Sequence, residues 1–319
     1  MTNYIGIDIS KRDFHVSFSE SGAVSQFNND KPGISLFLNY LKRNSNTSSG
    51  GSLGLESTGS YHLPVAYLCT QSGYTVHVIN PLITKKQNQT NLRRVKTDKQ
   101  DARLIRHCLI NGAGYSFCDT SESLALKTLV RQRSGYSMLR HRTRLRHDEV
   151  LHRESYLKIP ITTLNQELYD FLDIRIKDLD RILRKYNSKT QKLLRSIPGV
   201  GPQTAVTLLS EVGDITRFPD AQKLTAWIGL DPRVHQSGTS INGKGYITKR
   251  GNKLLRTRLF NAASVAVIHP PNIFYEFFEK KRSEGKPYRV ALCAVMRKMV
   301  HVIYAVWSRG NPFVNEYKN

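Results

Sequence analysis

Four acidic residues lie in short segments that are otherwise apolar, neutral or basic, and their order along the chain constrains the fold. Asp8 in YIGIDIS and Glu56 in SLGLEST each end an apolar run that predicts a buried strand. Asp98 and Asp101 in KTDKQDA are three residues apart on a predicted helix, so both carboxylates share one helix face. We expect all four to converge on one cleft that binds Mg²⁺, a cation that prefers oxygen ligands.

Each acidic residue also has a plainer interpretation when it is taken alone. Asp8 fits a carboxylate in a turn at a strand end, and Asp98 fits the N-cap of a helix. The four together favour the metal site, because metal ions held by carboxylates can activate an attacking oxygen and stabilise a leaving one in phosphodiester chemistry.

The first 118 residues predict an α/β domain with the element order of the ribonuclease-H-like (RuvC-like) fold. Three strands come first, followed by a helix and then by alternating strands and helices. The predicted strands are Tyr4–Ile9, Phe14–Phe18, Ala23–Phe27, Leu53–Glu56 and Thr75–Ile79, and the predicted helices are Gly33–Lys42, Tyr61–Ser72, one from Pro81, and Asp98–Ile110. A Rossmann domain would need a Gly-rich turn after its first strand, where this chain has Ser10-Lys11-Arg12.

Residues 119–192 predict a highly charged helical segment. Apolar residues from Leu168 to Leu183 repeat with heptad-like spacing, and Pro160 separates this run from an earlier one. An antiparallel helical hairpin or coiled coil that joins protomers fits this pattern. A helical linker packed on its own chain fits it equally well.

Residues 193–319 predict a mostly α-helical domain with a helix–hairpin–helix motif. The motif is the run Ile197–Pro202, in which Gly199 and Gly201 permit a tight turn before a helix. Backbone N–H groups at such a helix N-terminus can bind a DNA phosphate. The alternative is a helix cap without a ligand.

A formal net charge of +23 predicts a polyanionic partner, and the charge is distributed unevenly. Residues 1–90 carry a net charge of +2, residues 91–160 carry +8, and residues 161–319 carry +13. We expect nucleic-acid phosphates to be bound by basic residues of the later segments: Arg93, Arg94, Arg140, Arg142, Arg144, Arg146, Lys244, Lys249 and Arg250.

The cysteines and the apolar runs predict a cytoplasmic protein. Cys69, Cys108, Cys118 and Cys293 lack the spacing of a zinc site, so reduced structural cysteines are expected. The N-terminus has no signal-peptide pattern, and we expect no segment to approach the roughly 18 apolar residues of a membrane helix.

Several motifs, in the same order over nearly the whole chain, resemble those of one family. The motifs are GIDIS, LESTGSY, INP followed by KTDKQDA, IPGVGPQTA, WIGLDPRVHQSG and ITKRGNKLLR. They resemble the insertion-sequence transposases with a RuvC-like Asp-Glu-Asp-Asp domain, the group that includes the Piv DNA invertase. The resemblance implies a bacterial, RNA-guided, site-specific DNA recombinase that acts at the nucleoid.

The resemblance also implies how such an enzyme would work. The Mg²⁺-binding tetrad falls on Asp8, Glu56, Asp98 and Asp101, and a nucleophilic serine that forms a 5′-phosphoserine link to DNA falls on Ser237. Ser240 lies three residues further on and is the main rival, although Ser237 matches the Ser-Gly motif. The implied partners are target and donor DNA, a structured non-coding (bridge) RNA and further copies of the chain, as a dimer or tetramer.

Three other functions remain to be distinguished. A resolvase-like nuclease would use the tetrad and water, without a covalent adduct. A non-enzymatic nucleic-acid-binding protein would keep its carboxylates for structural reasons. A GID start also occurs in sugar kinases of the actin-like class, but the basic charge and the helix–hairpin–helix motif argue against a small-molecule substrate.

Overall fold

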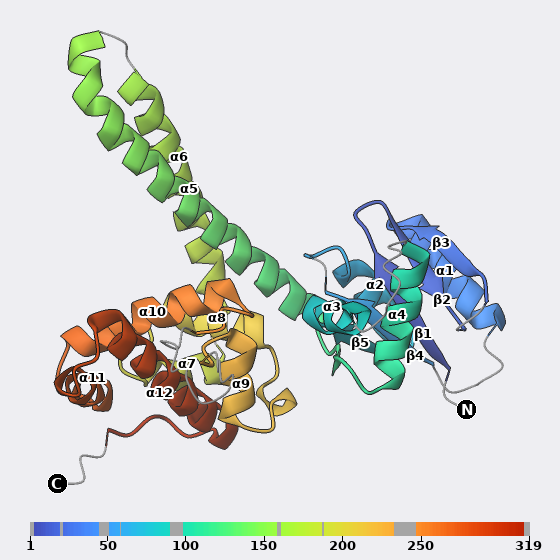
Figure 1. Ribbon diagram of the computed structural model, residues 1–319. Helices are drawn as coiled ribbons and strands as arrows, with labels where there is room; N and C mark the ends of the chain where they lie inside the picture. The colour runs from blue at the N-terminus through green and yellow to red at the C-terminus, as the bar shows by residue number, and fades with distance from the viewer. Residues whose placement is uncertain are drawn as a thin grey trace. The chain divides into compact units, whose positions relative to one another are not determined.

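The computed structural model describes residues 3–19, 22–44, 51–57, 59–89, 98–157, 161–186, 188–232 and 247–315. The chain divides into two compact units, residues 1–121 and 122–319 (Figure 1).

The first unit is an α/β domain, as the sequence predicts. Its strands are β1 (Tyr4–Ile9), β2 (Asp13–Ser17), β3 (Val24–Asn28), β4 (Ser52–Glu56), β5 (Thr75–Ile79) and β6 (Tyr115–Ser116), and its helices are α1 (Lys31–Asn44), α2 (Leu63–Gln71), α3 (Pro81–Gln89) and α4 (Asp98–Ile110). The predicted elements of this unit are confirmed, with small shifts at their ends. The two-residue strand β6 is an addition that the sequence analysis missed.

The six strands form one mixed sheet in the order β3-β2-β1-β4-β5-β6. Strand β4 pairs in parallel with β1 and with β5, whereas β1–β2, β2–β3 and β5–β6 are antiparallel. The parallel strands β1 and β4 lie at the centre of the sheet, and Asp8 and Glu56 lie at the carboxyl ends of these two strands.

Alternation along β1 separates an apolar face of the sheet from a face that carries Gly6 and Asp8. Ile7 and Ile9 are buried and pair with Val16 and Phe14 of β2. The Phe14 ring contacts the Phe37 ring of α1 at a centroid distance of 5.3 Å, so this face is covered by α1. Gly6 and Asp8 alternate with these residues, so they face the opposite side.

The second unit is helical in its described part, apart from an isolated β-bridge. Its helices are α5 (Ser121–Leu157), α6 (Ile161–Leu183), α7 (Lys189–Arg195), α8 (Pro202–Val212), α9 (Ala221–Ile228), α10 (Lys253–Ile268), α11 (Ile273–Ser283) and α12 (Tyr288–Arg309), with a 3₁₀ turn η1 (Ile215–Arg217). Helices α7 through α12 share one buried core, whose apolar residues include Leu208, Leu259 and Val295. Helix α11 is an element that the sequence analysis did not predict.

Helices α5 and α6 form an antiparallel hairpin (Figure 1). Two ion pairs join them, Arg133–Asp180 and Arg140–Asp173, so each helix advances seven residues between the pairs, in opposite directions. Such a step corresponds to two helical turns of closely packed helices. At its base the hairpin buries Val130 and Leu183 against Val206 of α8.

Helix α12 corrects one expectation from the sequence. It is long and apolar enough to cross a membrane by length and composition, although no such segment was expected. Half of the apolar stretch is buried inside the unit, where Val295, Met299 and Ile303 belong to the core. Burial of this kind is typical of the core helix of a globular domain.

Candidate functional site

Asp8 and Glu56 lie at the carboxyl ends of neighbouring parallel strands. The register of β1 and β4 pairs Ile7 with Leu55, so the next residues along the two strands are Asp8 and Glu56. Each lies two residues after a glycine, Gly6 or Gly54, that faces α4, and residues two apart in a strand share a face of the sheet. The sheet therefore brings these two predicted ligands together on the face covered by α4.

The two glycines allow α4 to lie directly on the strands. A Cβ added to Gly6 would meet the Ala102 carbonyl oxygen at 2.2 Å and the backbone nitrogen of Arg106 at 2.4 Å. Arg106 Nε donates a 2.8 Å hydrogen bond to the Tyr4 carbonyl, at the start of β1. Helix α4 thus runs back along β1, and its first turn lies toward the strand end that carries Asp8.

This direction of α4 places its acidic residues at the end of the sheet where Asp8 and Glu56 lie. Asp98 is the first residue of α4, and Asp101 lies next to Ala102, which covers Gly6. The side chain of Asp98 lies outside the described residues. Asp8, Glu56 and Asp101 are all partly exposed.

Glu56 is held by a residue that the sequence analysis missed. Thr84 of α3 is buried, and its hydroxyl donates a 2.6 Å hydrogen bond to Glu56 Oε2. Burial, and then the charge of Glu56, raise the pKa of the Cys108 thiol of α4. Helix α3 therefore holds the Glu56 carboxylate through Thr84.

His15 is a second neighbour of the acidic residues that the sequence analysis passed over. It pairs directly with Asp8 across the antiparallel β1–β2 ladder, and paired residues share a face of the sheet. Only the register of the hairpin identifies this pairing, because the two residues are separated by the Ser10–Arg12 turn.

Carboxylate oxygens at one end of the sheet suit a hard divalent cation. Among the described side chains, which exclude that of Asp98, no three His, Cys, Asp or Glu groups lie close enough together to hold a metal ion. The backbone thus brings the predicted ligands to one end of the sheet, and the described side chains do not form a compact ligand set.

The predicted serine lies on a segment whose two ends are fixed. Ser237, its rival Ser240 and Lys244 lie within residues 233–246, outside the described residues. On either side of this segment, Pro232 and Ile247 form an antiparallel bridge, and the Thr248 N–H donates a 2.9 Å hydrogen bond to the Asp231 carbonyl. We call residues 229–232 and 247–252 the stem.

The stem carries two of the predicted phosphate-binding residues, Lys249 and Arg250. Lys249 has φ of 54°, the left-handed region that side-chain-bearing residues rarely adopt. Its N–H donates a 3.1 Å hydrogen bond to the Gly229 carbonyl. Non-glycine residues in this conformation occur often at functional sites and need support from their surroundings.

The predicted helix–hairpin–helix motif coincides with two helices, α7 and α8, joined by a turn over residues 196–201. Gly199 has φ of 82°, and an added Cβ would meet the Ala262 carbonyl of α10 at 2.2 Å, so this glycine is required by packing. Gly201 is the N-cap of α8, and an added Cβ there meets no described atom within 4 Å. No described residue therefore blocks the approach of a ligand to the turn at Gly201.

The predicted arginines of α5 differ in their surroundings. Arg142, Arg144 and Arg146 are exposed, whereas Arg140 is paired with Asp173 and lies 5.7 Å from the centre of the Tyr169 ring. Arg93 and Arg94 lie outside the described residues. Three of these guanidinium groups thus face solvent along the hairpin, and Arg140 contributes to its packing.

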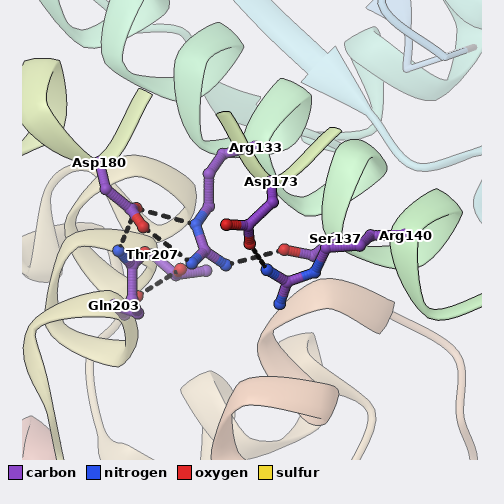
Figure 2. A network of polar contacts seen from close by, with 7 residues as sticks. All are labelled: Arg133, Ser137, Arg140, Asp173, Asp180, Gln203 and Thr207. Carbon is purple, nitrogen blue, oxygen red and sulfur yellow. Dashed lines mark hydrogen bonds and ion pairs between the residues drawn. The ribbon is translucent and has the colours of Figure 1, made fainter. Parts of the chain in front are cut away.

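A polar network fastens the hairpin to the rest of the second unit (Figure 2). Arg133 donates to both carboxylate oxygens of Asp180, at 2.9 and 3.1 Å, and to the Ser137 hydroxyl at 3.0 Å. Gln203, in the first turn of α8, donates its side-chain N–H to the same Asp180. The base of the hairpin is therefore connected to the helix that follows the Gly199–Gly201 turn.

Two of the cysteines are well shielded, in line with the predicted structural role. Burial raises the pKa of Cys69 to about 12, and Cys69 and Cys108 are both buried free thiols. A thiol with so high a pKa is a poor nucleophile at neutral pH.

Two family models match this chain, and both are described as transposases. A model of the DEDD IS110 type, described as "Transposase", matches residues 5–155, and one described as "Transposase IS116/IS110/IS902 family" matches residues 191–279. The pilin gene-inverting protein of Moraxella bovis is 29% identical over 314 residues, which is 97% of each chain. The transposase for insertion sequence element IS1111A of Coxiella burnetii is 36% identical over 135 residues, 42% of this chain and 36% of that protein.

Proposed function

Because this chain belongs to the IS110 family of transposases, we propose that it is a site-specific DNA recombinase guided by a structured RNA. The observation that carries the catalytic part of the proposal is the placement of Asp8 and Glu56 on adjacent strand ends beneath α4. We assign the first unit to the ribonuclease-H-like fold, supported by its 3-2-1-4-5 strand order with an antiparallel β2.

We propose three functional segments along the chain. Residues 1–118 are the RuvC-like catalytic domain, residues 119–192 are the helical coiled-coil segment, and residues 193–319 are the transposase domain with a helix–hairpin–helix and Ser237. The protein is cytoplasmic and acts at the nucleoid, where its DNA substrates lie.

The acidic residues would hold Mg²⁺. Asp8, Glu56, Asp98 and Asp101 supply the carboxylates, and Thr84 fixes the orientation of Glu56. Bound Mg²⁺ would neutralise the charge that develops on the scissile phosphate and lower the pKa of an attacking hydroxyl.

Ser237 is the proposed nucleophile of the cleavage step. Its Oγ attacks the phosphorus, an Oγ–P bond forms, and the P–O3′ bond breaks. The serine proton leaves the hydroxyl during attack, and a proton is taken up by the departing 3′ oxygen. The resulting 5′-phosphoserine conserves one phosphodiester, so attack by the 3′-hydroxyl of another strand reseals the DNA and frees the serine.

The basic residues would bind the phosphates of DNA and RNA. Arg142, Arg144 and Arg146 are exposed on α5, and Lys249 and Arg250 lie on the stem, close in sequence to the segment that contains Ser237. We extend the same role to Arg93, Arg94, Arg140, Lys244 and the turn at Gly199 and Gly201. The bridge RNA would select target and donor DNA by base pairing, so these contacts need no sequence preference.

The hairpin would join protomers into a dimer or tetramer. Large apolar side chains are at least half exposed along α5 and α6, including Leu145, Leu151, Leu164 and Phe171. A second copy of the hairpin would bury this stripe. Mixing Glu56→Gln and Ser237→Ala proteins tests whether active sites are shared: recovered recombination indicates shared sites, and no recovery indicates sites within one chain.

Recombination of a donor and a target plasmid by the purified protein, Mg²⁺ and the copurifying RNA tests the function as a whole. Asp8→Asn and Glu56→Gln should abolish recombination and leave the circular dichroism spectrum unchanged. Activity retained in either variant, or in a reaction without RNA, would contradict the proposal.

A further inference from the structure

Asn252 connects the start of α10 to a buried carboxylate on α8. Its Oδ1 accepts a 3.0 Å hydrogen bond from the Leu255 N–H, which caps α10. Its Nδ2 donates a 2.7 Å hydrogen bond to Glu211 Oε2. The Glu211 side chain is only 2% exposed, so its charge is stabilised by such donors and not by water.

The same carboxylate is bound from α5. Arg131 Nε donates to Glu211 Oε1 at 2.7 Å, and Arg131 Nη2 donates to Oε2 at 2.9 Å, a two-bond geometry that fixes the plane of the carboxylate. Glu211 therefore connects the helical hairpin on one side to Asn252 on the other.

Asn252 is the last residue of the stem, and the stem depends on close contacts. The preceding Gly251 packs so tightly on α9 that an added Cβ would meet the Trp227 carbonyl at 2.2 Å. Lys249 keeps its left-handed φ of 54° three residues before Asn252. A shift at Asn252 would thus be transmitted directly to Lys249 and to Ile247, which pairs with Pro232.

We infer that Asn252 and Glu211 are positioning residues for strand cleavage, which hold the stem that carries the Ser237 segment at a fixed place on α8. This inference rests on the proposed role of Ser237. Reaction rates are sensitive to small displacements of a nucleophile, so loss of the Asn252–Glu211 hydrogen bond should slow chemistry more than DNA binding.

A polarity swap tests the pair without changing the cap of α10. Asp caps helices as well as Asn does, so Asn252→Asp keeps the bond to Leu255 but places two carboxylates side by side. Adding Glu211→Gln puts an amide NH2 in the place of Oε2, where it can donate to the carboxylate introduced at position 252. The amide oxygen still accepts from Arg131 Nε, and only the bond from Arg131 Nη2 is given up. The double variant also has the same net charge as the wild type.

Two measurements in full-length protein, at a temperature where every variant is folded, decide the matter. The first is amide hydrogen exchange at Thr248 and Lys249, whose N–H groups bond to Asp231 and Gly229. The second is the single-turnover rate of DNA cleavage at saturating DNA, compared with the DNA dissociation constant of the same variant. Asn252→Asp should raise exchange and lower the rate by about ten-fold or more with little change in affinity, and the double variant should restore both.

The outcomes separate this inference from the proposed function. Unchanged exchange at both amides in Asn252→Asp, or an unchanged cleavage rate, would overturn the positioning role. Failure of the double variant to recover would overturn it too. A Ser237→Ala protein that still forms a DNA adduct would instead refute the proposed nucleophile, while the exchange measurement would still report on the stem.

Discussion

The hydroxyl of Thr84 lies 2.6 Å from Glu56 Oε2, so the first turns of α3 hold the carboxylate that ends β4. The contact joins residues 28 positions apart and connects two elements at one end of the sheet. A carboxylate that is fixed before metal binding loses less conformational freedom when the ion arrives.

Thr84→Val should therefore weaken Mg²⁺ binding without changing the size of the side chain. Removing a hydrogen bond to a metal ligand typically costs about ten-fold or more in metal affinity or activity. We expect the Mg²⁺ concentration that gives half-maximal DNA cleavage to rise, whereas Thr84→Ser should resemble the wild type. An unchanged Mg²⁺ midpoint in Thr84→Val would separate Thr84 from metal binding.

Gly6 should tolerate no side chain, because α4 lies directly on β1 there. Gly6→Ala forces a Cβ toward the Ala102 carbonyl, and overpacking of this kind costs about 1–3 kcal/mol. The control is Gly135→Ala in α5, where an added Cβ meets nothing within 4 Å and a gain of up to about 1 kcal/mol is expected. Thermal unfolding followed by circular dichroism compares them, and equal midpoints would contradict the close packing of α4.

The Arg133–Asp180 pair should matter far more to stability than an exposed pair on the same helix. Arg133 and Asp180 are only 14% and 20% exposed, so removing one partner should cost several times what an exposed pair contributes, up to about 3–5 kcal/mol for a fully buried pair. Arg133→Leu should therefore lower the urea midpoint strongly. Arg153→Leu is the control, because its pair with Glu149 is 65% and 61% exposed and is worth at most about 1 kcal/mol.

The strands and their acidic ends could be predicted from the sequence, whereas the register of the sheet and the buried polar contacts could not. Alternation in YIGIDIS and the apolar run before Glu56 were enough to predict β1, β4 and their acidic ends, because strand periodicity is a local property. Thr84 and Glu211 escaped notice because their partners are distant in sequence, and His15 because its pairing with Asp8 depends on the register of the β1–β2 hairpin. Helix α11 was missed where its aromatic residues are mixed with charged ones, which weakens the helical pattern.

The exposed arginines of α5 should contribute to nucleic-acid affinity through phosphates. Each phosphate contact adds roughly 0.9 to the slope of log affinity against log salt for duplex DNA. Replacing Arg142, Arg144 and Arg146 with Gln should therefore lower the slope by about 2–3. Fluorescence anisotropy at several salt concentrations measures it, and a slope equal to that of the wild type would place the contacts elsewhere.

We propose that Ser237 forms a covalent link to DNA in a reaction that needs the acidic residues. The most direct test is to incubate the protein with RNA, Mg²⁺ and a nicked or phosphorothioate DNA substrate, denature the reaction, and map the adduct by mass spectrometry. We expect a 5′-phosphoserine at Ser237 in the wild type and in Ser240→Ala, and none in Ser237→Ala or Glu56→Gln. An adduct on Ser240, or cleavage that persists in Ser237→Ala, would show that Ser237 is not the nucleophile.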